Sequence, residues 1–110
     1  MPIVWWGTMV ECESALSRQE REGSLGMAEA MAARAELDRM DAMWTEILPT
    51  TRVRNRARRL LRTHPLRAAD ALQLSAAIES AETMPGDPSF VCLDDRLCDA
   101  ARKEGFPVLP

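Results

Sequence analysis

The sequence contains no tyrosine, only two phenylalanines and three tryptophans, and it lacks any long hydrophobic run. A transmembrane helix needs about 20 consecutive apolar residues, and no stretch approaches that length, so we expect no membrane partner. The amino terminus has no basic region followed by an apolar stretch, so a secretory signal is not expected. Leucine, alanine and methionine are plentiful instead, and this composition favours helices.

Cysteine is also scarce, with Cys12, Cys92 and Cys98 forming no CxxC pair. An odd number of cysteines at this spacing predicts neither a disulfide framework nor a zinc knuckle. We therefore expect the three side chains to be small buried hydrophobes in a protein of the reducing cytoplasm.

The remaining composition fits one soluble globular domain over residues 1–110, with 46% apolar and 28% charged residues. The net charge of −3 hides an asymmetry, because half of the 14 basic residues are arginines of one segment without acids. Such a block predicts an edge that binds phosphate groups. The arginines in this block are Arg52, Arg54, Arg56, Arg58, Arg59, Arg62 and Arg67.

The hydrophobic spacing predicts strands alternating with helices. Short apolar runs predict buried strands over 2–8, 90–93 and 106–109. Apolar residues at helical spacing predict helices over 9–21, 25–48, 53–63, from 67 onward, and 96–104. We expect Ser24 to cap the second helix and Asp95 the last. The fold class is therefore α/β, with a parallel sheet flanked by helices.

Three acids stand where the active site of such a sheet lies, beyond the carboxyl ends of its strands. They are Glu11 after the first strand, Asp70 in a helix that is otherwise nearly all apolar, and Asp94 at the end of the strand over 90–93. Converging carboxylates repel each other and need a compensating cation. Oxygen ligands of this kind suit Mg²⁺ or Mn²⁺, which can activate a water for hydrolysis of a phosphodiester.

Each of these features also has a purely structural interpretation. An acid in the first turn of a helix interacts with the helix dipole and contributes about 0.3–1 kcal/mol. Long arginine side chains on the flanks of a helix often cover apolar surface and pair with acids, here those between Glu29 and Glu46. We expect His64, before Pro65 at a helix end, to bond to backbone carbonyls rather than act as a base.

Three segments together resemble the PIN-domain family, and most of all its VapC-like toxin ribonucleases of type II toxin–antitoxin pairs. The segments are Thr8–Cys12 (TMVEC), Leu66–Leu74 (LRAADALQL) and Phe90–Leu97 (FVCLDDRL). The resemblance implies a three-layer domain in which Glu11, Asp70 and Asp94 hold Mg²⁺ or Mn²⁺ and cleave RNA. It also implies a homodimer and inhibition by a cognate antitoxin.

One part of the family pattern has no counterpart in this chain. PIN domains open with a central strand that ends in an aspartate, whereas only ten residues precede Glu11 and none is acidic. We therefore expect a PIN-like domain that is incomplete at its N-terminus, with exposed backbone edges on the neighbouring strands. A late start of the reading frame, a degenerate gene and a partner that fills the gap are the three explanations.

The sequence thus predicts a metal-dependent endoribonuclease whose arginines Arg52, Arg56, Arg59 and Arg67 bind RNA. The alternative is a catalytically impaired PIN remnant that binds an antitoxin or another partner, with the strand Ile3–Trp6 as its docking surface. A third interpretation makes the arginine helix a simple nucleic-acid tether.

Overall fold

Five helices and four short strands make up the part of the chain that the computed structural model describes, residues 2–84, 86, 89–92 and 94–109. In chain order they are β1 (Ile3–Trp5), α1 (Thr8–Arg21), α2 (Met27–Asp41), β2 (Thr45–Ile47), α3 (Thr51–Thr63), α4 (Ala68–Thr83), β3 (Phe90–Val91), α5 (Asp95–Lys103) and β4 (Val108–Leu109). The predicted α/β class is confirmed, and three predicted helices (9–21, 53–63, 96–104) lie within two residues of α1, α3 and α5. Leu93, the predicted end of the third strand, lies outside the described residues.

Helix α4 is the centre of the molecule, because it contributes to two separate hydrophobic clusters. Leu74 packs with Leu60 of α3 and with Phe90 in the larger cluster. On another side of α4, Ala76 packs in the cluster that contains Trp5 of β1. A helix that is apolar almost all round is stable only when it is covered on several sides, and α4 is covered in this way.

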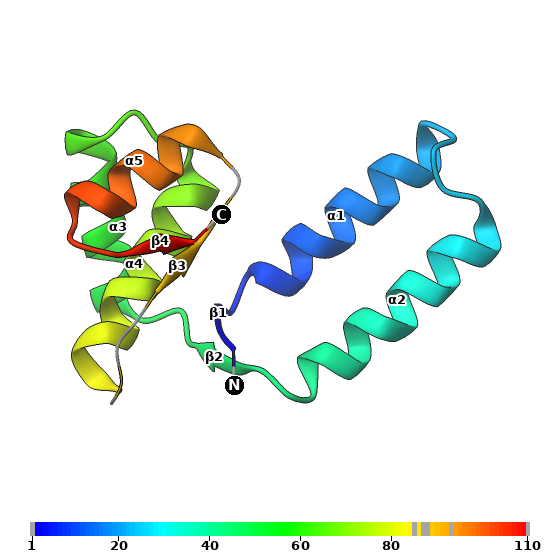
Figure 1. The fold of residues 1–110 in the computed structure, drawn as a ribbon, viewed down its shortest axis with the longest axis horizontal. Coiled ribbons are helices and arrows are strands. Elements are labelled where there is room, and N and C mark those ends of the chain that lie inside the picture. The colour runs from blue at the N-terminus through cyan, green and yellow to red at the C-terminus, as the bar shows by residue number, and fades with distance from the viewer. Residues whose placement is uncertain (1, 85, 87–88, 93, 110) are drawn as a thin grey trace.

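The strands form two separate parallel sheets instead of the single sheet that the sequence predicted. β1 pairs with β2, and β3 pairs with β4. Figure 1 shows the two pairs at different positions along α4, with β3 and β4 beside α5. The prediction of one parallel sheet is therefore wrong for the described residues, and the two sheets leave a space between β1 and β3.

The predicted helix over 25–48 is also wrong in its second half. α2 begins at Met27 and ends at Asp41, and β2 follows after a turn. Thr45 and Ile47 are residues that favour strands, and β2 pairs with β1 in register from Ile3↔Thr45 to Trp5↔Ile47. Pairing with a distant strand has thus overridden a spacing of apolar residues that was also compatible with a helix.

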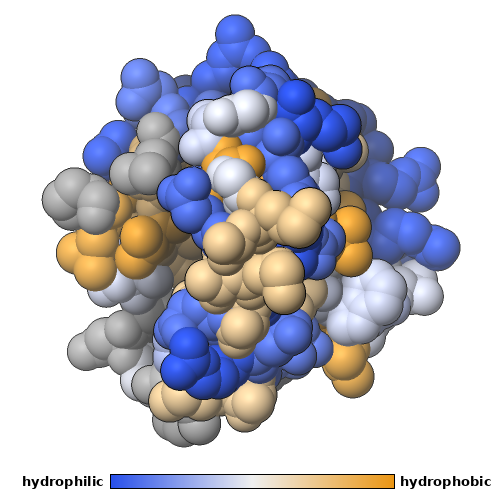
Figure 2. All heavy atoms as spheres, turned by 90° about the vertical axis from the view of Figure 1, so that its right-hand side faces the viewer, coloured by the Kyte–Doolittle hydropathy of each residue, from blue (hydrophilic) through white to orange (hydrophobic). Residues whose placement is uncertain are grey.

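Helices α1 and α2 form a hairpin that extends away from the rest of the molecule (Figure 1). The guanidinium of Arg34 on α2 joins them, with Nε 2.6 Å from Glu13 Oε2 and Nη2 3.0 Å from Glu20 Oε1. α1, all of whose residues are described, has no buried residue. Figure 2 looks at this end of the molecule and shows a stripe of weakly hydrophobic residues between hydrophilic ones. The methionines Met27, Met31, Met40 and Met43 are exposed.

Two smaller predictions are corrected at the ends of helices. Ser24 does not cap α2, because its hydroxyl donates to the carbonyl of Gln19 and Gly26 is the N-cap. Asp94, not Asp95, caps α5, with Oδ1 accepting from the N–H of Leu97 at 2.9 Å. Gly105, at φ +99°, lies after α5 as expected, because glycine tolerates this left-handed conformation.

Two cysteines form a disulfide, which contradicts the prediction of three small buried hydrophobes. Cys92 and Cys98 are bonded across a separation of six residues, and Cys12 is free. The odd number of cysteines excluded only a disulfide framework that uses every cysteine. It did not foresee that the first turn of α5 returns Cys98 to the end of β3, with a Cα–Cα distance of 6.1 Å.

None of the helices in the described part of the chain is long and apolar enough to cross a membrane.

Candidate functional site

The three predicted acids lie at the starts of three different helices. Glu11 is in the first turn of α1, Asp70 is in the first turn of α4, and Asp94 is the N-cap of α5. Each position follows a strand or a loop, so the local sequence places every acid where the backbone N–H groups of a helix are unpaired. Asp94 already has the ordinary structural role of an N-cap through its Oδ1.

Asp70 and Asp94 are close enough for their charges to interact. The pKa of Asp70 is raised, first because the carboxyl is partly buried and second because the Asp94 carboxylate repels a second negative charge. Arg67, the N-cap of α4, acts in the opposite direction and lowers this pKa. The sequence argument expected Asp70 to face a polar pocket or to bear a desolvation cost, and the structure shows that cost.

Glu11 is held by a residue that the sequence analysis did not select. The side-chain amide of Gln73 donates to Glu11 Oε2 at 2.5 Å, from one turn further along α4 than Asp70. Residues three apart on a helix share a face, so Gln73 connects Glu11 to the end of α4 that bears Asp70. The signal in the sequence was the polar pair Asp70 and Gln73 at this spacing in the mostly apolar first half of the helix.

The two carboxylates of Asp70 and Asp94 fit a divalent cation better than the three predicted acids together do. Among the described residues, no group of three or more histidine, cysteine, aspartate or glutamate side chains is arranged to hold a metal ion. Mg²⁺ usually keeps several waters and needs one or two carboxylates together with substrate phosphates. Asp70 and Asp94 supply two such carboxylates whose mutual repulsion a cation would relieve.

Three of the four arginines predicted to bind RNA are in ion pairs. Arg52 and Arg56 of α3 both contact Glu79 and Glu82 of α4, at N–O distances of 2.8 to 3.1 Å. Arg59 contacts Glu104 at 3.3 Å. These ion pairs match the structural interpretation of the block, but the acids belong to α4 and the end of α5 and not to 29–46 as expected.

Arg67 has a different environment from the other three arginines. It is exposed, and it lies near the partly buried carboxyl of Asp70. The second flank of α3, formed by Arg54, Arg58 and Arg62, is exposed as well. Positive charge that phosphate groups can reach is therefore found at Arg67 and on this second flank.

His64 pairs with a carboxylate rather than with backbone carbonyls, which corrects the prediction for it. Its Nε2 lies 2.9 Å from Glu104 Oε2, and its side chain is only 7% exposed. The hydrogen bond from His64, followed by that from Arg59, lowers the pKa of Glu104. This cluster ties the end of α3 to the end of α5 and lies apart from the acids described above.

No protein-family model matches the chain, and no curated protein matches it either. The resemblance to PIN domains therefore remains a prediction from three short segments of the sequence.

Proposed function

We propose that the chain is a metal-dependent endoribonuclease of the PIN, VapC-like type. The observation that carries the proposal is the raised pKa of Asp70, which has partial burial as its first cause and repulsion by the Asp94 carboxylate as its second. Two neighbouring carboxylates that repel each other lower the stability of the folded chain. Such unfavourable arrangements are common where a binding site requires them.

In this proposal Asp70 and Asp94 hold Mg²⁺ or Mn²⁺, and Glu11 of α1 is not a ligand but lies close to α4 through its hydrogen bond with Gln73. The cation would supply a more acidic bound water and would stabilise the charge that develops on the phosphodiester. Gln73 orients the Glu11 carboxylate through its 2.5 Å hydrogen bond. Arg67, whose charge acts on Asp70, is the arginine that we assign to an RNA phosphate. Arg52, Arg56 and Arg59 serve mainly to join helices through their ion pairs.

The proposal also includes partners and a location. The exposed methionines of the α1–α2 hairpin offer apolar surface for a second copy of the chain or for an antitoxin. RNA substrates place the protein in the cytoplasm, where the disulfide between Cys92 and Cys98 would be largely reduced.

Cleavage of fluorescent RNA oligonucleotides with millimolar Mg²⁺ or Mn²⁺ tests this function. We expect slow cleavage that stops on addition of EDTA and that falls at least about 10-fold in Asp70→Asn. The matched control is Asp38→Asn, which removes an exposed acid from α2 and is expected to leave the rate unchanged. Equal rates in Asp70→Asn and the control would overturn the assigned site.

The second candidate function is a partner-binding module without catalysis. It is favoured by the exposed apolar residues of the hairpin and by strands β1 and β3, each of which has only one paired neighbour among the described residues. In this case the chain binds its partner equally well with and without a divalent cation.

A further inference from the structure

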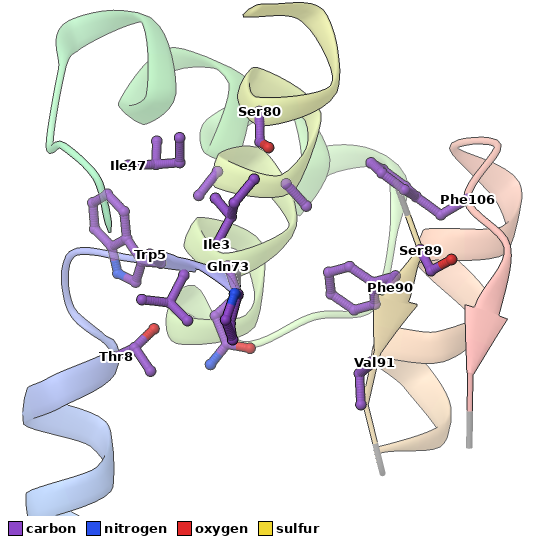
Figure 3. A pocket seen from close by; sticks show the side chains of 14 residues that line it. Ile3, Trp5, Thr8, Ile47, Gln73, Ser80, Ser89, Phe90, Val91 and Phe106 are labelled. Atoms are coloured by element: carbon purple, nitrogen blue, oxygen red, sulfur yellow. The ribbon is translucent and has the colours of Figure 1, made fainter. Parts of the chain in front are cut away.

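The space between the two sheets is a cavity of about 550 Å³. Figure 3 shows it from close by, with Trp5 and Ile47 on one side, Phe90 and Phe106 on the other, and α4 behind. Its lining is mostly apolar, and its volume is within the range of pockets that bind ligands. No residue of the proposed metal pair lines it.

The cavity is bounded by the edges of strands rather than by their faces. Successive side chains of a strand point to opposite faces of the sheet. A surface formed by one face of β1 would therefore include every second residue. The cavity instead contacts four consecutive residues, Pro2 to Trp5, and on its other side three consecutive residues, Ser89 to Val91.

These edges have free backbone hydrogen-bonding capacity. Among the described residues, β1 pairs only with β2 and β3 pairs only with β4, so each strand has one unpaired edge. Unpaired edges of this kind are templates for the addition of a further strand. A strand in the cavity would continue both existing parallel pairings and join them into one sheet.

Helix α4 forms the floor of the cavity with one of its faces. Gln73, Ala76, Ala77 and Ser80 line it, and their spacing of three, four and seven residues places them in one row. Three of these four side chains are small, which leaves room above the helix. An inserted strand would therefore pack its side chains on α4 as the strands of a layered α/β domain do.

No acidic residue among those described lines the cavity, but two acids follow the strands that bound it, and we refer to this end as the acidic end. Gln73 in its wall is hydrogen-bonded to Glu11, and β1 and β3 lead towards the helices that carry Glu11 and Asp94. In Figure 3, Thr8 and Val91 lie at one end and Ser80 at the other. Charge complementarity favours an occupant with a basic residue at the acidic end, after the carboxyl ends of β1 and β3.

We propose that this cavity binds an extended, apolar peptide strand of another polypeptide, inserted parallel to β1 and β3 and followed by a basic residue. Main-chain hydrogen bonds to both strand edges supply affinity, and the apolar wall and the acidic end supply selectivity. This inference names the partner that the second candidate function requires, and it does not depend on a metal ion.

The test uses three capped peptides of about six residues, slightly longer than a usual strand. The first alternates threonine and valine and ends in arginine, and the second has the same sequence in reverse. The third is the first peptide with alternate backbone nitrogens methylated, which removes hydrogen-bond donors and keeps every side chain. Binding to the full chain is measured by calorimetry and by tryptophan fluorescence, since Trp5 lines the cavity. All titrations contain EDTA, so a failure of the nuclease proposal does not affect them.

We expect the first peptide to bind at least about 10-fold more tightly than either of the others, because each lost hydrogen bond weakens binding several-fold. Equal binding of the methylated peptide would show an apolar pocket that does not recognise a strand, and would overturn the proposal. Absence of binding by all three peptides would also overturn it.

Two variants test whether the peptide binds in this cavity. Ala77→Phe fills the cavity from its floor and is expected to reduce binding of the first peptide at least about 10-fold. Ala81→Phe adds the same ring at an exposed position one turn further along α4 and is expected to have no effect. If Ala77→Phe instead dissociates a dimer of the chain, the occupant is a second copy, and the proposal of a separate partner is wrong.

Discussion

At the scale of single residues, Asp70 has an environment that is unfavourable for its ordinary charge state. Burial and the neighbouring Asp94 both favour its neutral form in the folded chain. A raised pKa means that the folded state holds this proton more tightly than the unfolded state does. The contribution of Asp70 to the free energy of unfolding therefore decreases as pH rises through that pKa.

We predict that Asp70→Asn becomes progressively more stable than the wild type between pH 4 and pH 7. The gain in the free energy of unfolding should reach about 0.5 kcal/mol, the scale of a partly exposed charge pair. Urea unfolding at both pH values measures it, with Asp38→Asn as the control. A difference that does not change with pH would show that Asp70 is not repelled by Asp94.

Glu104 has the opposite behaviour, because His64 and Arg59 favour its ionised form and lower its pKa. A lowered pKa contributes stability that is fully present above the ordinary value of about 4.3 and is lost as pH falls through the lowered one. We predict that Glu104→Gln lowers the free energy of unfolding by about 1–2 kcal/mol at pH 7.

The same substitution should cost less at pH 3 than at pH 7, because the stability that a lowered pKa contributes decreases as pH falls through that pKa. Glu36→Gln, on the exposed face of α2, is the matched control and should change stability little at either pH. A loss in Glu104→Gln that is equally large at both pH values would contradict the assigned ion pair.

At the scale of elements, α3 shows how far an apolar pattern determines packing. Leu60 and Leu61 are adjacent apolar residues of α3, but Leu60 is completely buried and Leu61 is 42% exposed. Adjacent residues on a helix point about 100° apart, so only one of the two can face α4 directly.

We predict that Leu60→Ala lowers the free energy of unfolding by about 2–5 kcal/mol, because it leaves a cavity between α3 and α4. Leu61→Ala removes the same atoms from an exposed position and should cost less than about 0.5 kcal/mol. Urea unfolding compares the two variants directly. Similar losses in both would mean that the face of α3 has been assigned incorrectly.

Most of the described elements were predictable from the sequence, including β1, β3 and β4, and β2 was not, for a physical reason. α1, α3 and α5 depend on spacing within one segment, and α3 and α5 also begin at capping side chains; both signals are visible in the sequence. β2 depends on pairing with β1, some forty residues earlier in the chain, and nothing within residues 42–48 marks the change with a glycine or proline. Local propensity is weak enough for such a distant contact to override it.

At the scale of the whole molecule, the sequence predicted three acids beyond the ends of strands, where helices begin, but not how these acids are arranged. Helix starts identified Glu11, Asp70 and Asp94, whereas the ligand geometry depends on how three helices pack. The tether of Glu11 to Gln73 and the separation of the two sheets are consequences of that packing. The cavity between β1 and β3 also results from that packing.

The two proposals therefore concern neighbouring but distinct parts of the molecule. The metal pair lies at the starts of α4 and α5, and the cavity for a strand runs beside it between the sheets. A strand bound in the cavity would end near Glu11 and would change the charge around the metal pair. The nuclease proposal and the strand proposal can be tested separately, because one requires a divalent cation and the other is tested in EDTA.

The most direct test of the nuclease proposal is to locate a bound cation by line broadening with Mn²⁺ in the proton–nitrogen NMR spectrum. This measurement detects weak binding and assigns it to residues, even when cleavage is slow. At substoichiometric Mn²⁺ we predict that the amide signals of Asp70 and Asp94 broaden first, that Asp70→Asn abolishes this effect, and that Asp38→Asn retains it. Broadening that is spread evenly over the acidic surface, or that persists in Asp70→Asn, would contradict the assignment of Asp70 and Asp94 as metal ligands.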